Sequence, residues 1–354
     1  MTRPPARRAS PLISVIICTY RRPQMALKAI RSVLAQEFAD YELLVVDQDS
    51  TDGLEAFVRA AVPGEAPIRY VRAVLPGVSH ARNVGAQHAR GEVLAFLDDD
   101  ARALPGWLAS YAELLAGPAP PAMVGGRLVP EWQSPRPRWY PACRLYLLGL
   151  YDIGQDVTPF PGFDLPMGAN FALRKDELLR WGGFDVRLGF DRSRSMALAG
   201  EESLLAARIR HAGGRLLHHP GATAAHLVRP EKLRFSYFLR RHFIEGRTQI
   251  AVAHGVSEMN VPALLGAINW HVWRRVTVRE KWSAWAVKFE ANPLECLADS
   301  AASMALSLGV VFESARLLIA SRRRAAGAGP ACVPAAGQAV PSSPSVSPIQ
   351  SPGP

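Results

Sequence analysis

The chain has 354 residues, 49% of them hydrophobic, and a formal net charge of +10 at neutral pH. This length and composition suit one large globular domain with appendages, or two domains, and the excess of positive charge favours an anionic partner such as a nucleotide, a nucleic acid or an acidic lipid. The four cysteines stand far apart without a C-x-x-C pair, which argues against a structural zinc site and suits a reducing, cytosolic compartment.

The N-terminal half of the sequence alternates strand-like and helix-like patterns. Residues 1–11 are basic and proline-rich, lack the apolar stretch of a signal peptide or membrane anchor, and are predicted to be disordered. Four apolar runs of strand length follow, at residues 13–19, 41–46, 68–71 and 93–97. Apolar residues at helical spacing predict a helix at residues 24–36, and two more helices are expected between the later strands, at residues 53–61 and 79–89. This alternation is typical of an α/β fold with an open parallel sheet.

Polar clusters follow three of the predicted strands, where ligands bind in parallel sheets. They are Thr19-Tyr20, the stretch DQDSTD at residues 47–52, and the stretch DDD at residues 98–100. Adjacent carboxylates repel in a partly desolvated site, so the aspartates at residues 98–100 predict a bound cation that neutralises them. Mg²⁺ or Mn²⁺ would accept oxygen ligands from the protein and from a diphosphate together.

Two common nucleotide-binding patterns are missing from the sequence. No G-x-G-x-x-G follows the first strand, which disfavours a dinucleotide fold of the NAD type, and no G-x-x-x-x-G-K-[ST] is present, which excludes a P-loop nucleotide triphosphatase. A bound phosphate would therefore be held by carboxylates and a metal rather than by a glycine-rich loop.

Several short motifs occur in one order along the chain. They read SVIICTYRRP, VVDQDSTDG, GVSHARNVG, FLDDDA, MGANFALRK, WGGFD followed by AGEESLLAAR, and ATAAHLV. Together, over residues 14–226, they resemble the family 2 glycosyltransferases. The resemblance implies an α/β fold of the GT-A type, with a mostly parallel central sheet and flanking helices; we expect a C-terminal helical extension after it. It also implies transfer of a hexosyl or deoxyhexosyl group, with inversion, from a nucleoside diphosphate sugar to an acceptor hydroxyl.

The resemblance assigns roles to individual residues of these motifs. The expected donor-nucleotide residues are Thr19, Tyr20, Arg22, Asp47, Gln48, Asp49, Arg82, Asp98 and Asp99. The residues expected beside the donor sugar or acceptor are Gly168, Ala169 and Asn170. The expected ligands of Mg²⁺ or Mn²⁺ are Asp98, Asp100 and His226. Asp100 would be the more direct ligand, and the Asp99 side chain would point the other way along an extended segment.

Arg82 and the glutamates near residue 200 would carry the chemistry. Arg82 would face the donor phosphates, to which a guanidinium makes two charge-assisted hydrogen bonds. The family carries Gly-Glu-Asp where this chain has Gly200-Glu201-Glu202. Glu202 stands at the aspartate position and is expected to be the base that takes the acceptor proton. Its extra methylene moves the carboxylate, so Glu201 remains open as the base.

Gln48 is a second departure from the family pattern, because many relatives carry an aspartate there that meets the nucleotide base. An amide both donates and accepts hydrogen bonds and can read a pyrimidine edge. Uracil and thymine therefore both remain open as the donor base.

Each of these residues also has an ordinary structural explanation. Asp47 and Asp49 could cap a helix, the aspartates at 98–100 could form a surface turn, and the glutamates could begin a helix. His226 could be an ordinary hydrogen-bonded histidine, Arg82 could decorate a helix, and Gly168 with Asn170 could form a plain loop. Helix capping does not predict their occurrence in one order, which favours the functional interpretation.

The remaining sequence concerns location more than chemistry. We divide the chain into a GT-A domain at residues 12–230, a basic helical region at 231–324 and an uncharged Pro/Ala/Ser-rich disordered tail at 325–354. Tryptophans interleaved with Lys and Arg at 270–289 suit either a helix on anionic lipid or a soluble subdomain with a tryptophan core. The uncharged stretch at 300–312 is shorter than the roughly 20 residues that cross a bilayer, so no spanning helix is predicted.

We therefore expect a metal-dependent glycosyltransferase of polysaccharide or glycolipid biosynthesis. Its expected acceptor is a saccharide or a lipid-linked molecule, and its expected location is the cytoplasm, or the cytoplasmic face of an anionic membrane, without nucleic acid as a partner. Two alternatives remain. A sugar nucleotidyltransferase would need a glycine-rich basic loop, which residues 14–22 lack, and a non-catalytic basic binding protein would have no use for the clustered carboxylates.

Overall fold

The computed structural model describes residues 10–49, 53–62, 68–190, 198–257, 263, 266 and 292–327. A nine-stranded sheet runs through the described part in the order β3-β2-β1-β4-β8-β6-β9-β5, with β7 beside β9. Its strands are β1 (Ile13–Thr19), β2 (Tyr41–Asp47), β3 (Ile68–Arg72), β4 (Val93–Leu97), β5 (Ala101–Ala103), β6 (Met123–Trp132), β7 (Thr158–Pro159), β8 (Asn170–Arg174) and β9 (Leu216–Val228).

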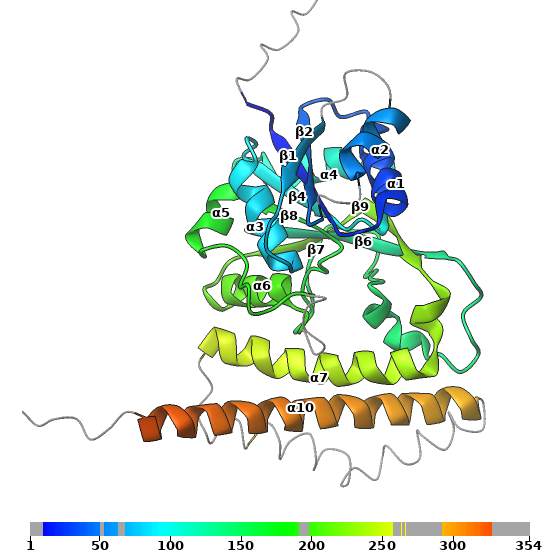
Figure 1. Ribbon diagram of the computed structural model, residues 1–354, viewed down its shortest axis with the longest axis vertical. Coiled ribbons are helices and arrows are strands. Elements are labelled where there is room, and N and C mark those ends of the chain that lie inside the picture. Colours follow the sequence, from blue (N-terminus) through cyan, green and yellow to red (C-terminus); the bar gives the residue numbers. More distant parts are fainter. Residues whose placement is uncertain are drawn as a thin grey trace, which may run out of the picture.

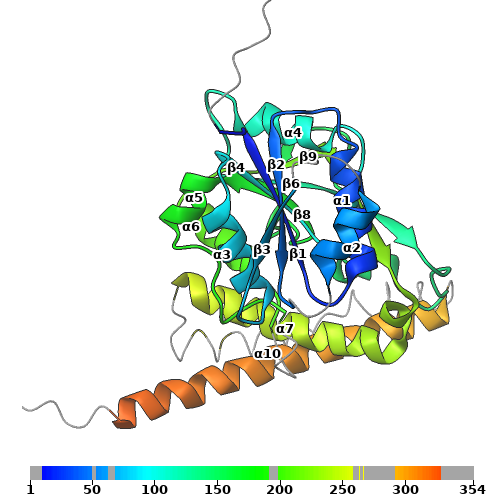
Figure 2. The same ribbon diagram turned by 45° about the horizontal axis from the view of Figure 1, so that its top comes forward.

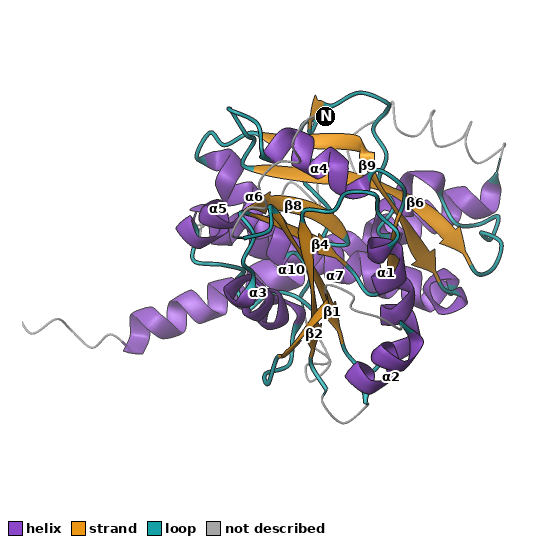
Figure 3. Ribbon diagram, turned by 90° about the horizontal axis from the view of Figure 1, so that it is seen from above, coloured by secondary structure: helices purple, strands orange, loops and turns teal. Residues whose placement is uncertain are grey.

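Helices cover both faces of this sheet, as Figures 2 and 3 show. They are α1 (Pro23–Leu34), α2 (Leu54–Ala61), α3 (Val78–His88), α4 (Trp107–Leu115), α5 (Lys175–Arg180), α6 (Glu201–His211), α7 (Phe235–Ser257) and α10 (Pro293–Gly327), with short 3₁₀ turns η1 (Ala142–Leu148) and η2 (Pro230–Leu233). Side chains that alternate along β1 divide the core between the two faces. Val15 packs in one cluster with α1, α2 and α4, whereas Ile16 packs in the other with α3, α5 and α6.

The first half of the sheet confirms the strand and helix predictions. β3, β2, β1 and β4 lie parallel, within a residue or two of their predicted bounds. Thr19 at the end of β1 is in register with Asp47 at the end of β2. The polar clusters that follow these strands are therefore brought to one edge of the sheet, as parallel pairing requires.

The second half of the sheet is mixed rather than parallel. β8 is antiparallel to β4 and β6, and β9 is parallel to β6 but antiparallel to β5 and β7. The α/β class is confirmed, but parallel pairing is limited to the strands from β3 to β4 and to the β6–β9 pair. The antiparallel strands return the chain to the same edge: the β5 and β9 register sets His226 opposite Ala101, and Asp98 N donates to Ala169 O at 3.2 Å.

A pair of long helices forms a separate layer beneath the sheet, with α10 lying along α7 (Figure 1). Buried Arg247 of α7 pairs with fully buried Glu313 of α10 at 3.0 Å. The two backbones touch, because a Cβ atom built on Gly309 would fall within hard contact of Phe243 O, and one built on Gly246 would do the same with Leu306 O. Only glycine lets two helices approach so closely.

We expect Gly309→Ala to destabilise the fold by about 1–3 kcal/mol, the usual cost of overpacking, even though alanine favours a helix. Chemical denaturation followed by circular dichroism measures this change. The control is Gly117→Ala, where the nearest heavy atom to an added Cβ is an ordinary 3.6 Å away, and it should stay within about 0.5 kcal/mol of wild type. Equal stability of the two variants would contradict the close helix contact.

The C-terminal expectations have mixed outcomes. Among the described residues, Pro293–Ser321 of α10 is long and apolar enough to cross a membrane by length and composition, so the short run at 300–312 understated this helix. α10 continues to Gly327, slightly past the predicted start of the tail. The tryptophan-rich residues 270–289 and most of the predicted N-terminal and C-terminal disordered segments lie outside the described residues.

Candidate active site

A cavity of about 750 Å³ lies at the edge of the sheet where the parallel strands end, closed on one side by η1, η2 and α7. Most residues singled out from the sequence line it: Thr19, Tyr20, Arg22, Gln48, Arg82, Asp98, Asp99, Asp100, Gly168, Ala169, Glu201, Glu202 and His226. The fold therefore brings together motifs that span about two hundred residues of sequence. Asp47, Asp49 and Asn170 do not line the cavity.

The three aspartates after β4 point to three different partners. Asp98 accepts from Arg82 Nη2 at 2.9 Å. Asp99 accepts from Thr19 Oγ1 at 2.8 Å and from Arg22 Nη1 at 2.9 Å. Asp100 lies 3.2 Å from His226 Nε2 and accepts from Lys232 Nζ at 3.3 Å. The side chain of Asp98 is 37% exposed, against 9% or less for the other two, so Asp98 is the most open to a ligand.

The ionisation of the aspartates follows from these partners. Burial raises the pKa of Asp99 to about 6 in spite of the nearby Arg22 guanidinium. Although burial acts in the same direction at Asp100, Lys232 and His226 hold the pKa of that carboxyl well below its usual range. Asp100 therefore carries a full negative charge at neutral pH, as a metal ligand must.

Arg82 connects three segments of the site through hydrogen bonds. Its guanidinium is 3% exposed, donates to Asp98 at 2.9 Å and to Gly168 O at 2.7 Å, and is also hydrogen-bonded to Glu201. The rings of Phe96, Phe171 and Phe184 surround it, with centroids 5.4–5.9 Å away. Most of its N–H groups thus bond to protein oxygens, and these bonds connect three motifs. Few N–H groups of the guanidinium remain for the phosphates of a nucleoside diphosphate sugar.

The two adjacent glutamates occupy different environments in the first turn of α6. Glu201 is 4% exposed and paired with Arg82, and burial together with the neighbouring Glu202 raises its pKa above the usual range. Glu202 is half-buried, lines the cavity and lies against the glycine loop, where a Cβ on Gly168 would be 3.0 Å from its Cδ. Gly200, at φ +93, makes the turn into this helix, because a side chain there would be strained and would collide with Thr248.

Residues 14–178 match the family model described as "Glycosyl transferase family 2". This part of the chain is a family 2 glycosyltransferase domain. This sets aside the nucleotidyltransferase and the non-catalytic binding protein as alternatives.

Relatives of this glycosyltransferase cover most of its catalytic region. The glucosyl-dolichyl phosphate glucuronosyltransferase of Haloferax volcanii is 25% identical over 239 residues, which is 66% of this chain and 75% of the relative. The succinoglycan biosynthesis protein ExoM of Rhizobium meliloti is 28% identical over 265 residues, 72% of this chain and 81% of the relative. The solved mannosyltransferase PcManGT of Pyrobaculum calidifontis superposes with a TM-score of 0.54 at 20% identity, covering 87% of this chain and 88% of its own, which confirms the GT-A fold.

Asn170 has a structural role that differs from the expected one. Its side chain is fully buried, and its Oδ1 accepts from Trp107 Nε1 and from Tyr111 Oη at 2.7 Å each. Its Nδ2 donates to Arg127 O at 3.0 Å and to Ala222 O at 2.8 Å. This side chain has no bonding capacity left for a sugar. Asn170 therefore fixes the β8, β6 and β9 backbones on the core side of the glycine loop.

The loop after β2 also divides its roles. Asp47 Oδ1 accepts from Asp49 N at 2.9 Å, and Asp49 pairs with Arg21. Both aspartates thus shape the loop in the glycosyltransferase. Gln48 does line the cavity, and its Oε1 accepts from Gly77 N at 3.1 Å. Cys18 lines the cavity too, but burial raises the pKa of its thiol to about 12, so it stays protonated and is no nucleophile.

Sequence reasoning missed the basic wall of the cavity. Arg229, Lys232, Arg240 and Arg241, from β9's end, η2 and α7, line the side facing the aspartates. Arg229 Nε and Arg241 Nη1 are buried donors without a hydrogen-bond partner. Arg229 and Lys232 follow His226 by three and six residues in the sequence HLVRPEK. This spacing is the sequence signal for the basic wall. Buried unpaired guanidinium donors facing a cavity call for an anionic ligand.

The residues present suit a divalent metal that is completed by a substrate. Asp100 and His226 are adjacent, and His226 Nδ1 is a buried atom without a hydrogen-bond partner. Within the described part of the chain, no group of three or more His, Cys, Asp or Glu could hold a metal ion by itself. Mg²⁺ and its relatives commonly take only one or two protein carboxylates and complete their shell with phosphate oxygens and water. The donor set therefore fits a metal that arrives with a diphosphate.

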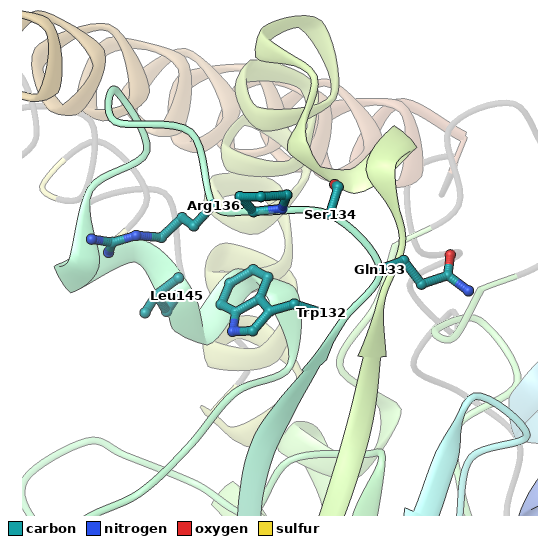
Figure 4. Close-up of a pocket in the computed structure, with 6 residues that line it drawn as sticks. Trp132, Gln133, Ser134, Arg136 and Leu145 are labelled. Carbon is teal, nitrogen blue, oxygen red and sulfur yellow. The ribbon is translucent and has the colours of Figure 1, made fainter.

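A second cavity, of about 510 Å³, lies at the far end of β6 beside η1 (Figure 4). Trp132, Gln133, Ser134, Pro135, Arg136 and Leu145 line it. None of these side chains is a carboxylate, a thiol or an imidazole, so this cavity lacks groups for acid, base or nucleophilic chemistry.

Proposed function

We propose that this glycosyltransferase transfers a sugar from a nucleoside diphosphate sugar to an acceptor hydroxyl with inversion at the anomeric carbon. The observation that carries the proposal is the single cavity in which Asp98, Asp100 and His226 face a basic wall, with the Glu202 carboxylate at its side. Such a cavity offers separate places for a diphosphate and for a base.

The leaving group would be held by a metal and by basic side chains. A bound Mg²⁺ or Mn²⁺, held by Asp98, Asp100 and His226, would stabilise the charge that grows on the departing nucleoside diphosphate. Lys232, whose ammonium lies 3.3 Å from Asp100, and Arg229, whose guanidinium has an unpaired donor, would bind the diphosphate oxygens next to the metal. Gln48 and Tyr20, which also line the cavity, would contact the nucleoside.

Glu202 would take the proton of the acceptor hydroxyl. An alcohol attacks well only as its proton is removed, so a carboxylate must lie within hydrogen-bond reach. Glu202 opens on the cavity, whereas Glu201 is enclosed with Arg82. With one carboxylate placed as base and the leaving group bound on the other side, a single displacement inverts the anomeric centre.

The names of the relatives support an acceptor class. The Haloferax volcanii protein is named for a glucosyl-dolichyl phosphate and the Rhizobium meliloti protein for succinoglycan biosynthesis, and the Pyrobaculum calidifontis structure holds GDP-Man and Mn²⁺. We propose a saccharide or lipid-linked acceptor in polysaccharide or glycolipid biosynthesis, handled at the cytoplasmic side of a membrane.

A binding experiment with Asp100→Asn tests the donor site. Titrating the protein with UDP-, GDP- and dTDP-sugars, with and without Mn²⁺, should identify a donor whose binding requires the metal. The variant should bind that donor about 100-fold more weakly, because even outer partners of a metal contribute about 10–100-fold. Asp176→Asn, 66% exposed on α5, should bind like wild type. Absence of nucleoside diphosphate release from every donor would refute the proposed reaction.

A further inference from the structure

The side of α10 that faces away from α7 is apolar along most of the helix. Its exposed large side chains, here called the outer stripe, are Leu294 at 61%, Leu297 at 52%, Met304 at 63%, Leu308 at 61% and Ile319 at 54% exposure. At about 100° per residue they fall within an arc of about 80°, and they span about 38 Å along the axis. Single exposed apolar residues are ordinary, but an aligned set marks an interaction surface.

The acidic residues of α10 all lie on the opposite side of the helix. Asp299 accepts from Arg144 Nε at 2.6 Å, and Glu313 is fully buried between Arg247 and Arg316. Glu295 accepts from Asn292 Nδ2 at 2.9 Å. Among the described residues of α10, none of the outer-stripe arc is acidic, so nothing there would repel an anionic surface.

Basic residues border the outer stripe near its C-terminal end. Arg323 is exposed, and Arg316 is still 52% exposed although it pairs with Glu313; the sequence around Arg323 reads SRRR. Basic side chains at the edge of an apolar helical face are the composition of a helix that lies in a lipid interface and contacts anionic headgroups.

We propose that the outer stripe docks α10 lengthwise onto an anionic lipid bilayer. A second copy of the chain would bury the apolar stripe equally well, but it would gain nothing from the bordering arginines. Although α10 is long enough to span a membrane, its inner face is fixed along α7 by the Arg247–Glu313 pair and by the backbone contact at Gly246 and Gly309. The helix therefore lies on the membrane with the protein above it.

This orientation bears on the acceptor, a point that rests on the proposed function. Tyr237, Arg241 and Ile244 of α7 line the active-site cavity, while Gly246 and Arg247 on its other side meet α10. Packed helices lie about 8–10 Å apart and each is about 10 Å across, so the cavity would stand two helix layers, α7 and α10, or roughly 20 Å above the lipid surface. A lipid-linked acceptor could reach it without leaving the bilayer.

Vesicle flotation of the full-length protein, without donor, tests the docking. Wild type should float with vesicles of equal parts phosphatidylglycerol and phosphatidylcholine at low salt, float less with pure phosphatidylcholine, and be released by alkaline carbonate. Leu308→Glu should lower the bound fraction about tenfold, since it places a charge in the lipid interface. Gln249→Glu, exposed on α7, adds the same charge elsewhere and should bind like wild type.

Three results would overturn the docking: no flotation of wild type with anionic vesicles, equal flotation of Leu308→Glu and wild type, or retention in the membrane after carbonate. Light scattering adds a fourth, a wild-type dimer that Leu308→Glu converts to a monomer, which would assign the stripe to a second copy. Nucleoside diphosphate release in solution should be unchanged in Leu308→Glu, so failure of the docking is separable from failure of the proposed reaction.

Discussion

Replacing Arg82 with methionine is expected to destabilise the protein by about 3–5 kcal/mol, the range seen when one partner of a buried ion pair is removed. The variant would leave Glu201, at 4% exposure, without its cation, and would remove hydrogen bonds to Asp98 and Gly168. Urea denaturation followed by circular dichroism measures the change in the free energy of unfolding.

Two further variants serve as controls for this prediction. Arg59→Met removes an exposed pair with Glu55 on α2 and should cost no more than about 0.5 kcal/mol. Adding Glu201→Gln to Arg82→Met removes the stranded charge and should recover part of the lost stability, which a double-mutant cycle measures. If Arg82→Met were as stable as Arg59→Met, the hydrogen bonds of the Arg82 guanidinium would not hold the site together.

Replacing Glu202 with glutamine is expected to lower the transfer rate by about 10²–10⁴-fold, the usual contribution of a general base. Donor binding and the unfolding free energy should change little, because Glu202 is half-buried at the cavity and no ion pair joins it to another described residue. Steady-state release of nucleoside diphosphate in the presence of acceptor, together with donor titration, separates the two effects.

Glu201→Gln is the matched comparison for this prediction. It removes a carboxylate at the next position, but one that is paired with Arg82. It should therefore lower the unfolding free energy first, with donor affinity falling as the site loosens. A Glu201→Gln variant that is stable and inactive, beside an active Glu202→Gln, would reverse the assignment of the base.

The parallel half of the fold could be predicted because its signals are local. Each of β1, β2, β3 and β4 is a short apolar run followed by polar residues, and parallel pairing then brings those residues to one edge. The same logic predicts from the sequence alone that Gln48 and the aspartates after β4 lie at one edge of the sheet.

The other half of the site depends on pairing between distant segments, which local patterns do not encode. Nothing in the residues around Asn170 tells whether its amide faces a sugar or the core; the answer depends on Trp107 and Tyr111 from α4. Arg82 looks like a surface arginine on α3 until Glu201, 119 residues later, is placed against it. The basic wall likewise exists only because η2 and α7 fold back over the sheet edge.

The glycine contact between α7 and α10 has a mechanical consequence. Where side chains separate two packed helices, a change of rotamer can absorb a small displacement. At Gly246 and Gly309 the backbones of α7 and α10 are in direct contact, with no side chain between them. A displacement of α10 would therefore displace α7 as well. Arg241 and Tyr237 of α7 line the cavity. We expect a displacement of α10 to shift the wall of the cavity that α7 forms.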